Sequence, residues 1–151
     1  MNPEQEILEK WIERLTGPCP EPATALCSAQ PDPFRNPVSY TIRKGLSQLW
    51  EQLLREMDPG TVDAALDSIL RIRAVQDVSP DEAVRFVADL RPLLRQLPSE
   101  LDRTLVEGRI DRLALAALDK YRLCREQINV VRLHEAERLT GVHRAARKVC
   151  L

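Results

Sequence analysis

The chain has 151 residues, the size of one ordinary domain, and its 44% hydrophobic and 30% charged residues exclude a disordered protein. Lys and Arg total 22 against 23 Asp and Glu, and this net charge of −1 excludes a strongly basic nucleic-acid binder. No apolar run approaches the roughly 18 residues of a membrane span, and the acidic N-terminus is unlike a secretory signal. We therefore expect a cytoplasmic protein whose partners include neither nucleic acid nor membrane.

Prolines and capping residues mark the beginnings of the expected helices. Asn2 with Pro3, and Ser79 with Pro80 and Glu82, combine an N-cap side chain with a first-turn proline. Apolar residues at three- and four-residue spacing follow each beginning, and Pro92 is expected to bend the fourth helix or end it early. These signals predict helices over residues 3–16, 38–57, 61–76 and 80–96.

Between the first two helices lies a connector, residues 17–38, that holds six of the eleven prolines. That density excludes a long helix there. Within it, Asp32-Pro33-Phe34-Arg35-Asn36-Pro37-Val38-Ser39-Tyr40 combines stiff turns with an aromatic anchor, and Asn36 or Ser39 can cap the next helix. The motif suits a structural clamp on the core, or alternatively a binding segment.

The last segment is predicted to be the longest helix, from Ser99 to about Leu139, with a break at Gly108 and a regular apolar stripe from Ile110. No alternating strand pattern occurs, so the sequence predicts an all-α fold of five or six helices with a long C-terminal helix. Part of the stripe fits a heptad seam for a second copy of the chain, or else packs within its own domain. The seam residues are Ala117, Tyr121, Cys124, Ile128 and Val131.

Side chains that could carry catalysis or hold a metal are poorly placed. There is no glycine-rich phosphate loop and no GxSxG motif, and neither His134 nor His143 has a metal-ligand companion at helical spacing. The four cysteines are not spaced as a zinc knuckle, and Cys124 lies on an apolar helix face. We therefore predict no catalytic residue, no metal and no cofactor.

Arg73 is predicted to lie within an apolar helix face, where a guanidinium needs an anion or hydrogen-bond acceptors. Asp77, one turn further on, could be its partner, or an anionic ligand or a partner's carboxylate could take that place.

At the other end of the chain, residues 132–151 hold five basic and two acidic residues, which suits a helix C-terminus. The expected organisation is a helical domain over residues 1–139 and a basic tail over residues 140–151.

Three stretches together carry a family resemblance: Asp32 to Arg43, Ile72 to Pro80, and Arg109 to Glu126. They resemble the N-terminal domain of RsbRD-type RsbT co-antagonist proteins, and the match runs in order over about residues 4–139. The resemblance implies a globin-like helical bundle without haem that acts as a dimeric sensory module of the stressosome. In such proteins a STAS domain follows and carries the output. That domain would need about 100 further residues, so with the chain ending at Leu151 we expect the fold and a sensing or docking character to carry over, but not a stressosome role.

The sequence thus predicts a non-catalytic, haem-free globin-like regulatory domain that forms a homodimer and binds a partner protein or a small effector. Haem is disfavoured because both histidines follow the position that an axial ligand would need. One alternative is a redox-associated accessory protein that uses the thiol of Cys124 or Cys150, and another is a scaffold without a ligand. The candidate effector- or partner-binding residues are Arg35, Tyr40, Arg43, Arg73, Gln76 and Asp77.

Overall fold

The structure is a computed structural model that describes residues 2–16, 36–97 and 103–149, with side chains described as far as residue 141. Over these residues it contains helices and no strand, as predicted. The helices are α1 (Pro3–Thr16), α3 (Pro37–Leu54), α4 (Pro59–Val75), α5 (Pro80–Ala88), α6 (Leu90–Leu94) and α7 (Arg103–Val149). Most of the proline-rich connector, including Phe34 and Arg35, lies outside the described residues.

Local capping explains where the helices begin. The side chains of Asn36, Asp58 and Ser79 each accept a hydrogen bond from the backbone N–H of the residue three positions later. A proline directly follows each of these caps, in the first turn of the helix. The predicted beginnings at Pro3 and Pro80 are confirmed. The second helix ends at Leu54 rather than at residue 57, and α4 begins at Pro59, capped by Asp58, rather than at residue 61.

The predicted interruption by Pro92 is also confirmed, because α5 ends at Ala88 and α6 begins at Leu90. Proline has no N–H to donate, so the carbonyl of Ala88, four residues earlier, cannot receive its helical hydrogen bond. The chain turns at Asp89 and continues as a short second segment.

The expected break at Gly108 is wrong, because α7 runs without interruption from Arg103 to Val149. Val106 is buried and continues the phase of Ile110, Leu113 and Ala117, whereas Leu105 is half exposed. The break was expected because Leu105, an apolar residue, lies on the side of the helix opposite Ile110, but the buried stripe runs through Val106 instead. A single glycine within a helix costs only about 1 kcal/mol, which packing against the rest of the domain outweighs.

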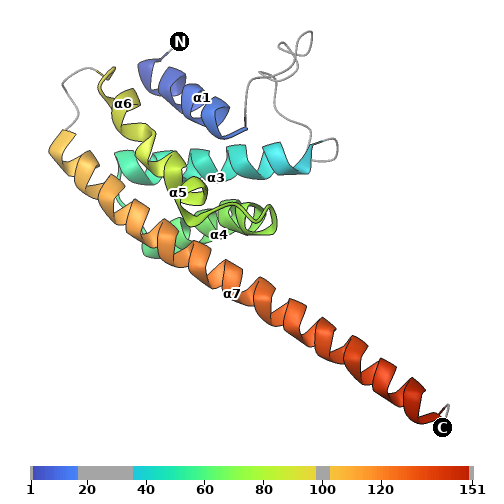
Figure 1. Ribbon diagram of the computed structural model, residues 1–151. Coiled ribbons are helices and arrows are strands. Elements are labelled where there is room, and N and C mark those ends of the chain that lie inside the picture. Colours follow the sequence, from blue (N-terminus) through green and yellow to red (C-terminus); the bar gives the residue numbers. More distant parts are fainter. Residues whose placement is uncertain (1, 17–35, 98–102, 150–151) are drawn as a thin grey trace.

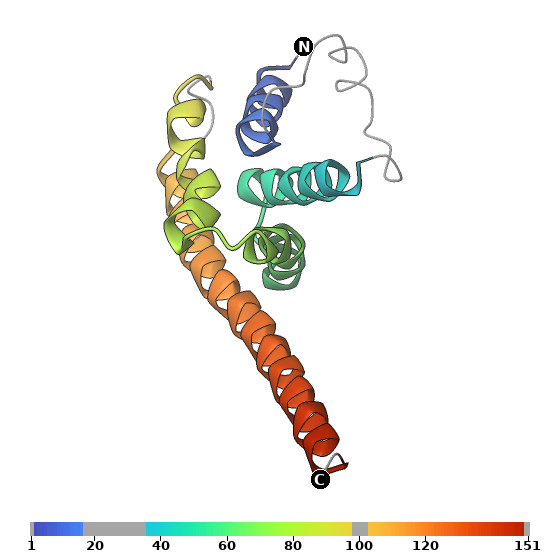
Figure 2. The same ribbon diagram turned by 45° about the vertical axis from the view of Figure 1, so that its right-hand side comes forward.

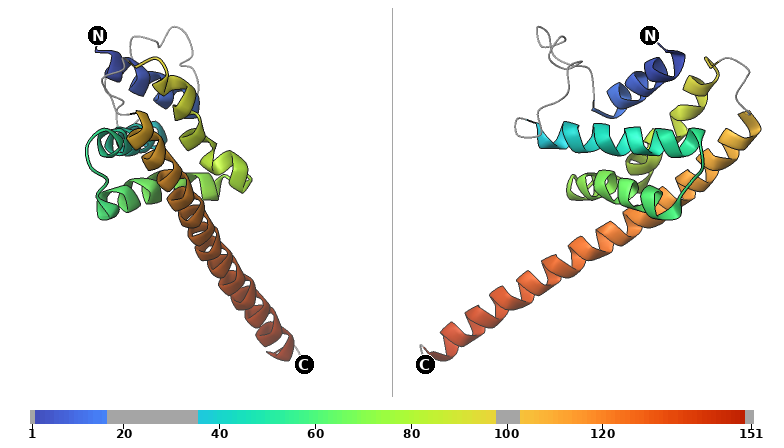
Figure 3. Two further views of the ribbon diagram at one scale, coloured as in Figure 1. Left: turned by 90° about the vertical axis from the view of Figure 1, so that its left-hand side faces the viewer. Right: turned by 180° about the vertical axis from the view of Figure 1, so that it is seen from behind.

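The helices form one packed body from which α7 projects (Figure 1). Helix α1 packs on α3, α3 packs on α4, and α7 crosses α4 and α5 (Figures 1 and 2). The second half of α7 extends away from this body, and its C-terminal end is far from every other helix (Figure 3). With 47 residues, α7 is about 70 Å long.

Trp11 of α1 lies in the core where α1, α3 and α5 meet, and it has no exposed surface. Its ring contacts the rings of Trp50 and Phe86, with centroid distances of 6.5 and 6.2 Å, and its Nε1–H donates to the Phe86 carbonyl at 2.7 Å. The indole therefore contributes a large apolar area while its polar edge keeps a hydrogen bond. These contacts tie α1, α3 and α5 together.

The interior is filled by apolar side chains, and no polar or charged residue is buried among the described residues. Where α3 and α4 meet, Gly45 is buried and allows close approach, since a Cβ there would lie 2.9 Å from the Cδ1 and Cγ1 atoms of Ile69. Each helix of the described residues falls short of either the length or the hydropathy that a membrane span requires.

Candidate functional site

The corner between α4 and α5 brings together three of the predicted site residues. Arg73, Gln76 and Asp77 lie at the C-terminal end of α4, and Asp77 adopts a left-handed backbone conformation with φ of 56°. A left-handed residue directly after a helix is a common way to end it, and aspartate tolerates this conformation better than most residues. The corner then leads directly into α5 at Ser79 and Pro80.

Arg73 is half buried, as its place on the helix predicted, but Asp77 is not its partner. Its guanidinium donates to the side-chain oxygen of Gln76 and to the carbonyl of Glu82, each at 3.2 Å. Its Nε atom is buried and has no hydrogen-bond partner among the described residues. Arg73 therefore links the end of α4 to the first turn of α5 without an ion pair to any described residue.

Asp77 instead pairs with Arg125 of α7, at 2.6 Å. The same guanidinium donates to the Ala74 carbonyl at 2.9 Å, and the hydroxyl of Tyr121 donates to the carbonyl of Val78. A positive charge suits the carbonyl end of a helix, so Arg125 also complements the dipole of α4. The corner is thus fastened to α7 by Tyr121 and Arg125, which lie one turn apart.

Arg109 of α7 binds the C-terminal end of α3 in the same way, since its guanidinium donates to the Leu53 carbonyl at 2.8 Å. The long helix therefore carries two arginines that bind the ends of two other helices. Sequence reasoning did not find this role, because the partners are backbone carbonyls, which leave no signature in the residue pattern.

The remaining predicted site residues lie elsewhere. Tyr40 and Arg43 are on α3, and Arg43 forms a two-pronged ion pair with Glu9 of α1 at 2.8 and 3.1 Å. Over the described residues, neither a hydrogen bond nor an ion pair joins Tyr40 or Arg43 to the corner. The structure therefore separates the predicted set into two groups, and Arg35 falls outside the described residues.

The predicted seam residues of α7 are mostly in contact with their own domain. Ala117, Tyr121 and Cys124 are buried in the core, and Ile128 packs against its edge. Val131 is exposed, at 59% of its surface. The stripe therefore serves the fold as far as Ile128, because α4 and α5 already cover that face of α7.

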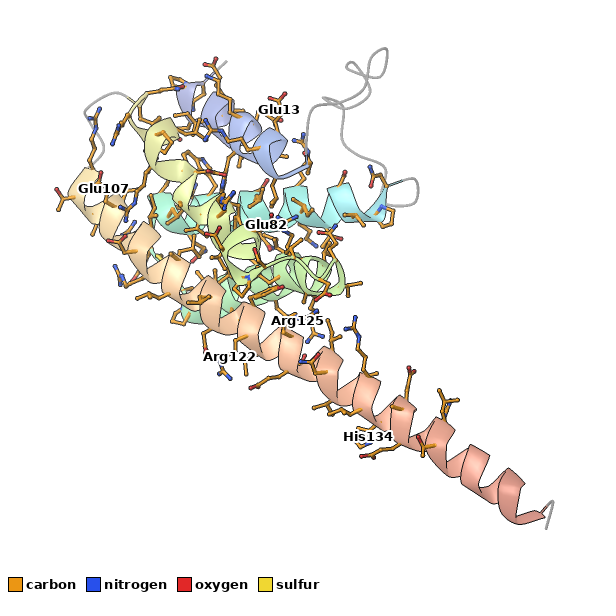
Figure 4. The ribbon with its side chains drawn as sticks, in the orientation of Figure 1. Glu13, Glu82, Glu107, Arg122, Arg125 and His134 are labelled. Carbon is orange, nitrogen blue, oxygen red and sulfur yellow. The ribbon has the colours of Figure 1, made fainter. Side chains whose placement is uncertain are left out.

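Among the exposed apolar residues of α7 are Leu115, exposed over 70% of its surface, and Leu118, exposed over 46%. Together with the corner, these side chains border an open groove of about 1000 Å³ that also reaches Arg122 and Glu126. Figure 4 shows Arg122 and Arg125 on this stretch of α7, while His134 lies further along the projecting part. Leu115 was not singled out from the sequence, whereas Leu118 was placed in the apolar stripe after Ile110 and is instead half exposed, because it lies at the edge of that stripe.

Cys124 is the thiol that the structure describes, and only 3% of its surface is exposed. Burial raises the pKa of this thiol, and the nearby charge of Asp67 raises it further, against smaller opposing effects of Arg71 and Lys120. A redox-active cysteine needs an exposed thiol with a lowered pKa. The observations on Cys124 therefore oppose the redox alternative, and Cys150 lies outside the described residues.

Beside Cys124, Lys120 connects α7 to α4 through Asp63, at 2.7 Å, and Asp67, at 4.0 Å. The hydrogen bond that the Lys120 ammonium donates to Asp63 is the main reason why the pKa of Lys120 is raised. Among the described residues, no cluster of histidine, cysteine and carboxylate side chains has the arrangement of a metal site. The charged groups of this region hold helices together.

The sequence model of one protein family, the RsbT co-antagonist protein rsbRD N-terminal domain, matches residues 5–138, which is most of the chain. The chain belongs to this family. Membership implies a regulatory role in stressosome signalling with protein partners of that system, and it agrees with a non-catalytic domain. The expectation that only the fold and a docking character carry over is therefore too narrow. No curated protein and no solved structure matches the chain significantly.

Proposed function

We propose that this RsbRD N-terminal domain is a non-catalytic, haem-free regulatory module that forms a homodimer along the outward side of α7 and binds a partner protein or a small effector. The observation that carries the proposal is the exposure of Leu115 and Leu118 beside an open groove, on a helix whose opposite side is already packed. Adjoining exposed apolar side chains that border a groove and are rimmed by polar groups mark a surface that another molecule covers.

A second copy suits this surface because its charges are mixed. Arg122 lies between Asp119 and Glu126 and forms ion pairs with both, at 3.1 and 3.0 Å. A two-fold interface brings the same patch of both chains together, so each chain must offer both signs of charge next to the apolar centre. Leu115 and Leu118 would supply that centre.

The projecting half of α7 provides a means of transmitting a signal. It begins where the core contacts end, near Ile128, and it remains helical as far as Val149. A ligand or partner that binds one arrangement of the two long helices more tightly would shift the population toward that arrangement. The proposed division into a domain over residues 1–139 and a basic tail places the boundary within this helix.

Haem does not suit the interior. His134 is the histidine whose side chain the structure describes, and it lies exposed on the projecting part of α7 (Figure 4). An axial ligand would have to come from inside the bundle. The described part of the interior holds no histidine, which supports a module that works by binding.

Sedimentation equilibrium tests the dimer. The unaltered chain should sediment as a dimer at micromolar concentration, and a variant with Leu115→Glu and Leu118→Glu should sediment as a monomer with unchanged helical content. Val75→Glu is the matched control, because Val75 is also 70% exposed but lies outside the groove. A monomeric unaltered chain, or dissociation by the control alone, would refute the proposed interface.

A further inference from the structure

A second, smaller hollow lies where α6 and the first turns of α7 come together. Its volume is about 190 Å³, and it is distinct from the groove beside Leu115. Figure 1 shows the end of α6 and the beginning of α7 at the same end of the molecule, and Figure 4 marks Glu107 on the α7 side. The hollow has room for roughly six water-sized groups.

Three arginines surround this hollow: Arg91, Arg95 and Arg103. Arg91 forms an ion pair with Asp111, and Arg103 donates to the Leu97 carbonyl at 3.1 Å. The backbone N–H of Arg95 donates to the Leu93 carbonyl, but its guanidinium has neither a hydrogen bond nor an ion pair with any residue that the structure describes. Glu107 is the acidic residue of the lining, so an excess of positive charge remains although the whole chain carries −1.

The inner wall of the hollow is apolar. Leu97 and Val106 are each only 5% exposed, and Leu94 is half buried beside them. A guanidinium matches a carboxylate with two parallel hydrogen bonds, and an apolar wall next to it favours an aliphatic group. The hollow therefore offers one position for a negative charge and an adjoining position for a short hydrocarbon.

We propose that this hollow is an effector site for a small aliphatic monocarboxylate, whose carboxylate binds Arg95 and Arg103 while its hydrocarbon contacts Leu94, Leu97 and Val106. The inference deepens the proposed function, on which it rests for the idea that the domain binds an effector. A monoanion fits better than a dianion, because Asp111 already neutralises Arg91 and Glu107 offsets part of the remaining charge. The short hydrocarbon follows from the small volume.

Titration with sodium pentanoate tests the site, followed by the NMR shifts of the backbone amides of residues 94–97 and 103–107 in the full chain. We expect saturable shifts with a dissociation constant of about 1 mM. Arg95→Gln should weaken binding about tenfold, because it removes a charge-assisted hydrogen bond. It should leave the fold intact, since the Arg95 side chain has no described partner to lose and the backbone hydrogen bond to Leu93 is kept. Arg132→Gln is the matched control, as Arg132 is an exposed arginine on the projecting part of α7.

Two further ligands separate the contributions. Pentan-1-ol, which has the chain without the charge, should not saturate the site, and sulfate, which has charge without the chain, should bind more weakly than pentanoate. Equal shifts with sulfate would indicate nonspecific attraction of anions and would overturn the proposal, as would equal binding by Arg95→Gln and Arg132→Gln. Sedimentation of the same samples keeps the two proposals apart. A chain that sediments as a dimer but shows no saturable shifts with pentanoate would refute the effector site and leave the proposed dimer standing.

Discussion

Replacing Gly45 with alanine measures how closely α3 and α4 pack. A Cβ at this position would lie 2.9 Å from two atoms of Ile69 and 3.4 Å from the Ala65 carbonyl oxygen. Ile69 has no exposed surface, and β-branched side chains are restricted to one rotamer in a helix, so it cannot easily move aside. Overpacking of this kind costs about 1 to 3 kcal/mol.

The same substitution also has a favourable part, because alanine stabilises a helix interior by about 0.5 to 1 kcal/mol relative to glycine. Gly108→Ala isolates that part, since a Cβ at Gly108 meets no atom of the described residues within 4 Å. We expect Gly108→Ala to raise the free energy of unfolding by about 0.5 to 1 kcal/mol. Gly45→Ala should lower it by up to about 2 kcal/mol.

Urea unfolding followed by circular dichroism, at one protein concentration for all variants, gives both values. In thermal unfolding, each kcal/mol corresponds to about 2 to 4 °C for a chain of this size. Combining Gly45→Ala with Ile69→Val, which removes the Cδ1 atom, should recover part of the loss, and the double-mutant cycle measures the coupling. If Gly45→Ala stabilises the chain as much as Gly108→Ala, the close approach of α3 to α4 is refuted.

Three other variants test the corner, the thiol and a cap. Asp77→Ala should lower the free energy of unfolding by about 1 to 2 kcal/mol, and Asp77→Gly by less, because glycine adopts the φ of 56° without strain; equal losses would contradict this. In a variant with Cys124 as its single cysteine, a disulfide reagent should react at least about 100-fold more slowly in buffer than in urea, and rapid native reaction would revive the redox alternative. Hydrogen bonds from Thr61 lower the pKa of Asp58 below 3.8, so its stabilising contribution is present above that pH and is lost as the pH falls through the lowered value. In Asp58→Asn the melting temperature should therefore fall less between pH 4 and pH 2 than it does in the unaltered chain. Parallel curves of melting temperature against pH for the two proteins would exclude this role.

The sequence by itself determined where most helices begin. A cap such as Asn36 or Ser79 and its proline act on N–H groups within three residues, so the whole interaction is contained in a short stretch of chain. The interruption by Pro92 is local for the same reason. The family could likewise be identified from three short stretches of sequence, and the family model matches residues 5–138.

The tertiary structure decided which molecule each helix face meets. The stripe through Ala117 and Cys124 suited either a second chain or the chain's own core, and only the position of α4 and α5 assigns it to the core. The same is true of Asp77, which the sequence offered as a partner for Arg73 and which the structure pairs with Arg125. Periodicity fixes which residues share a face, but contacts between residues 48 positions apart depend on how separate helices pack, and that information is not contained in any short stretch of sequence.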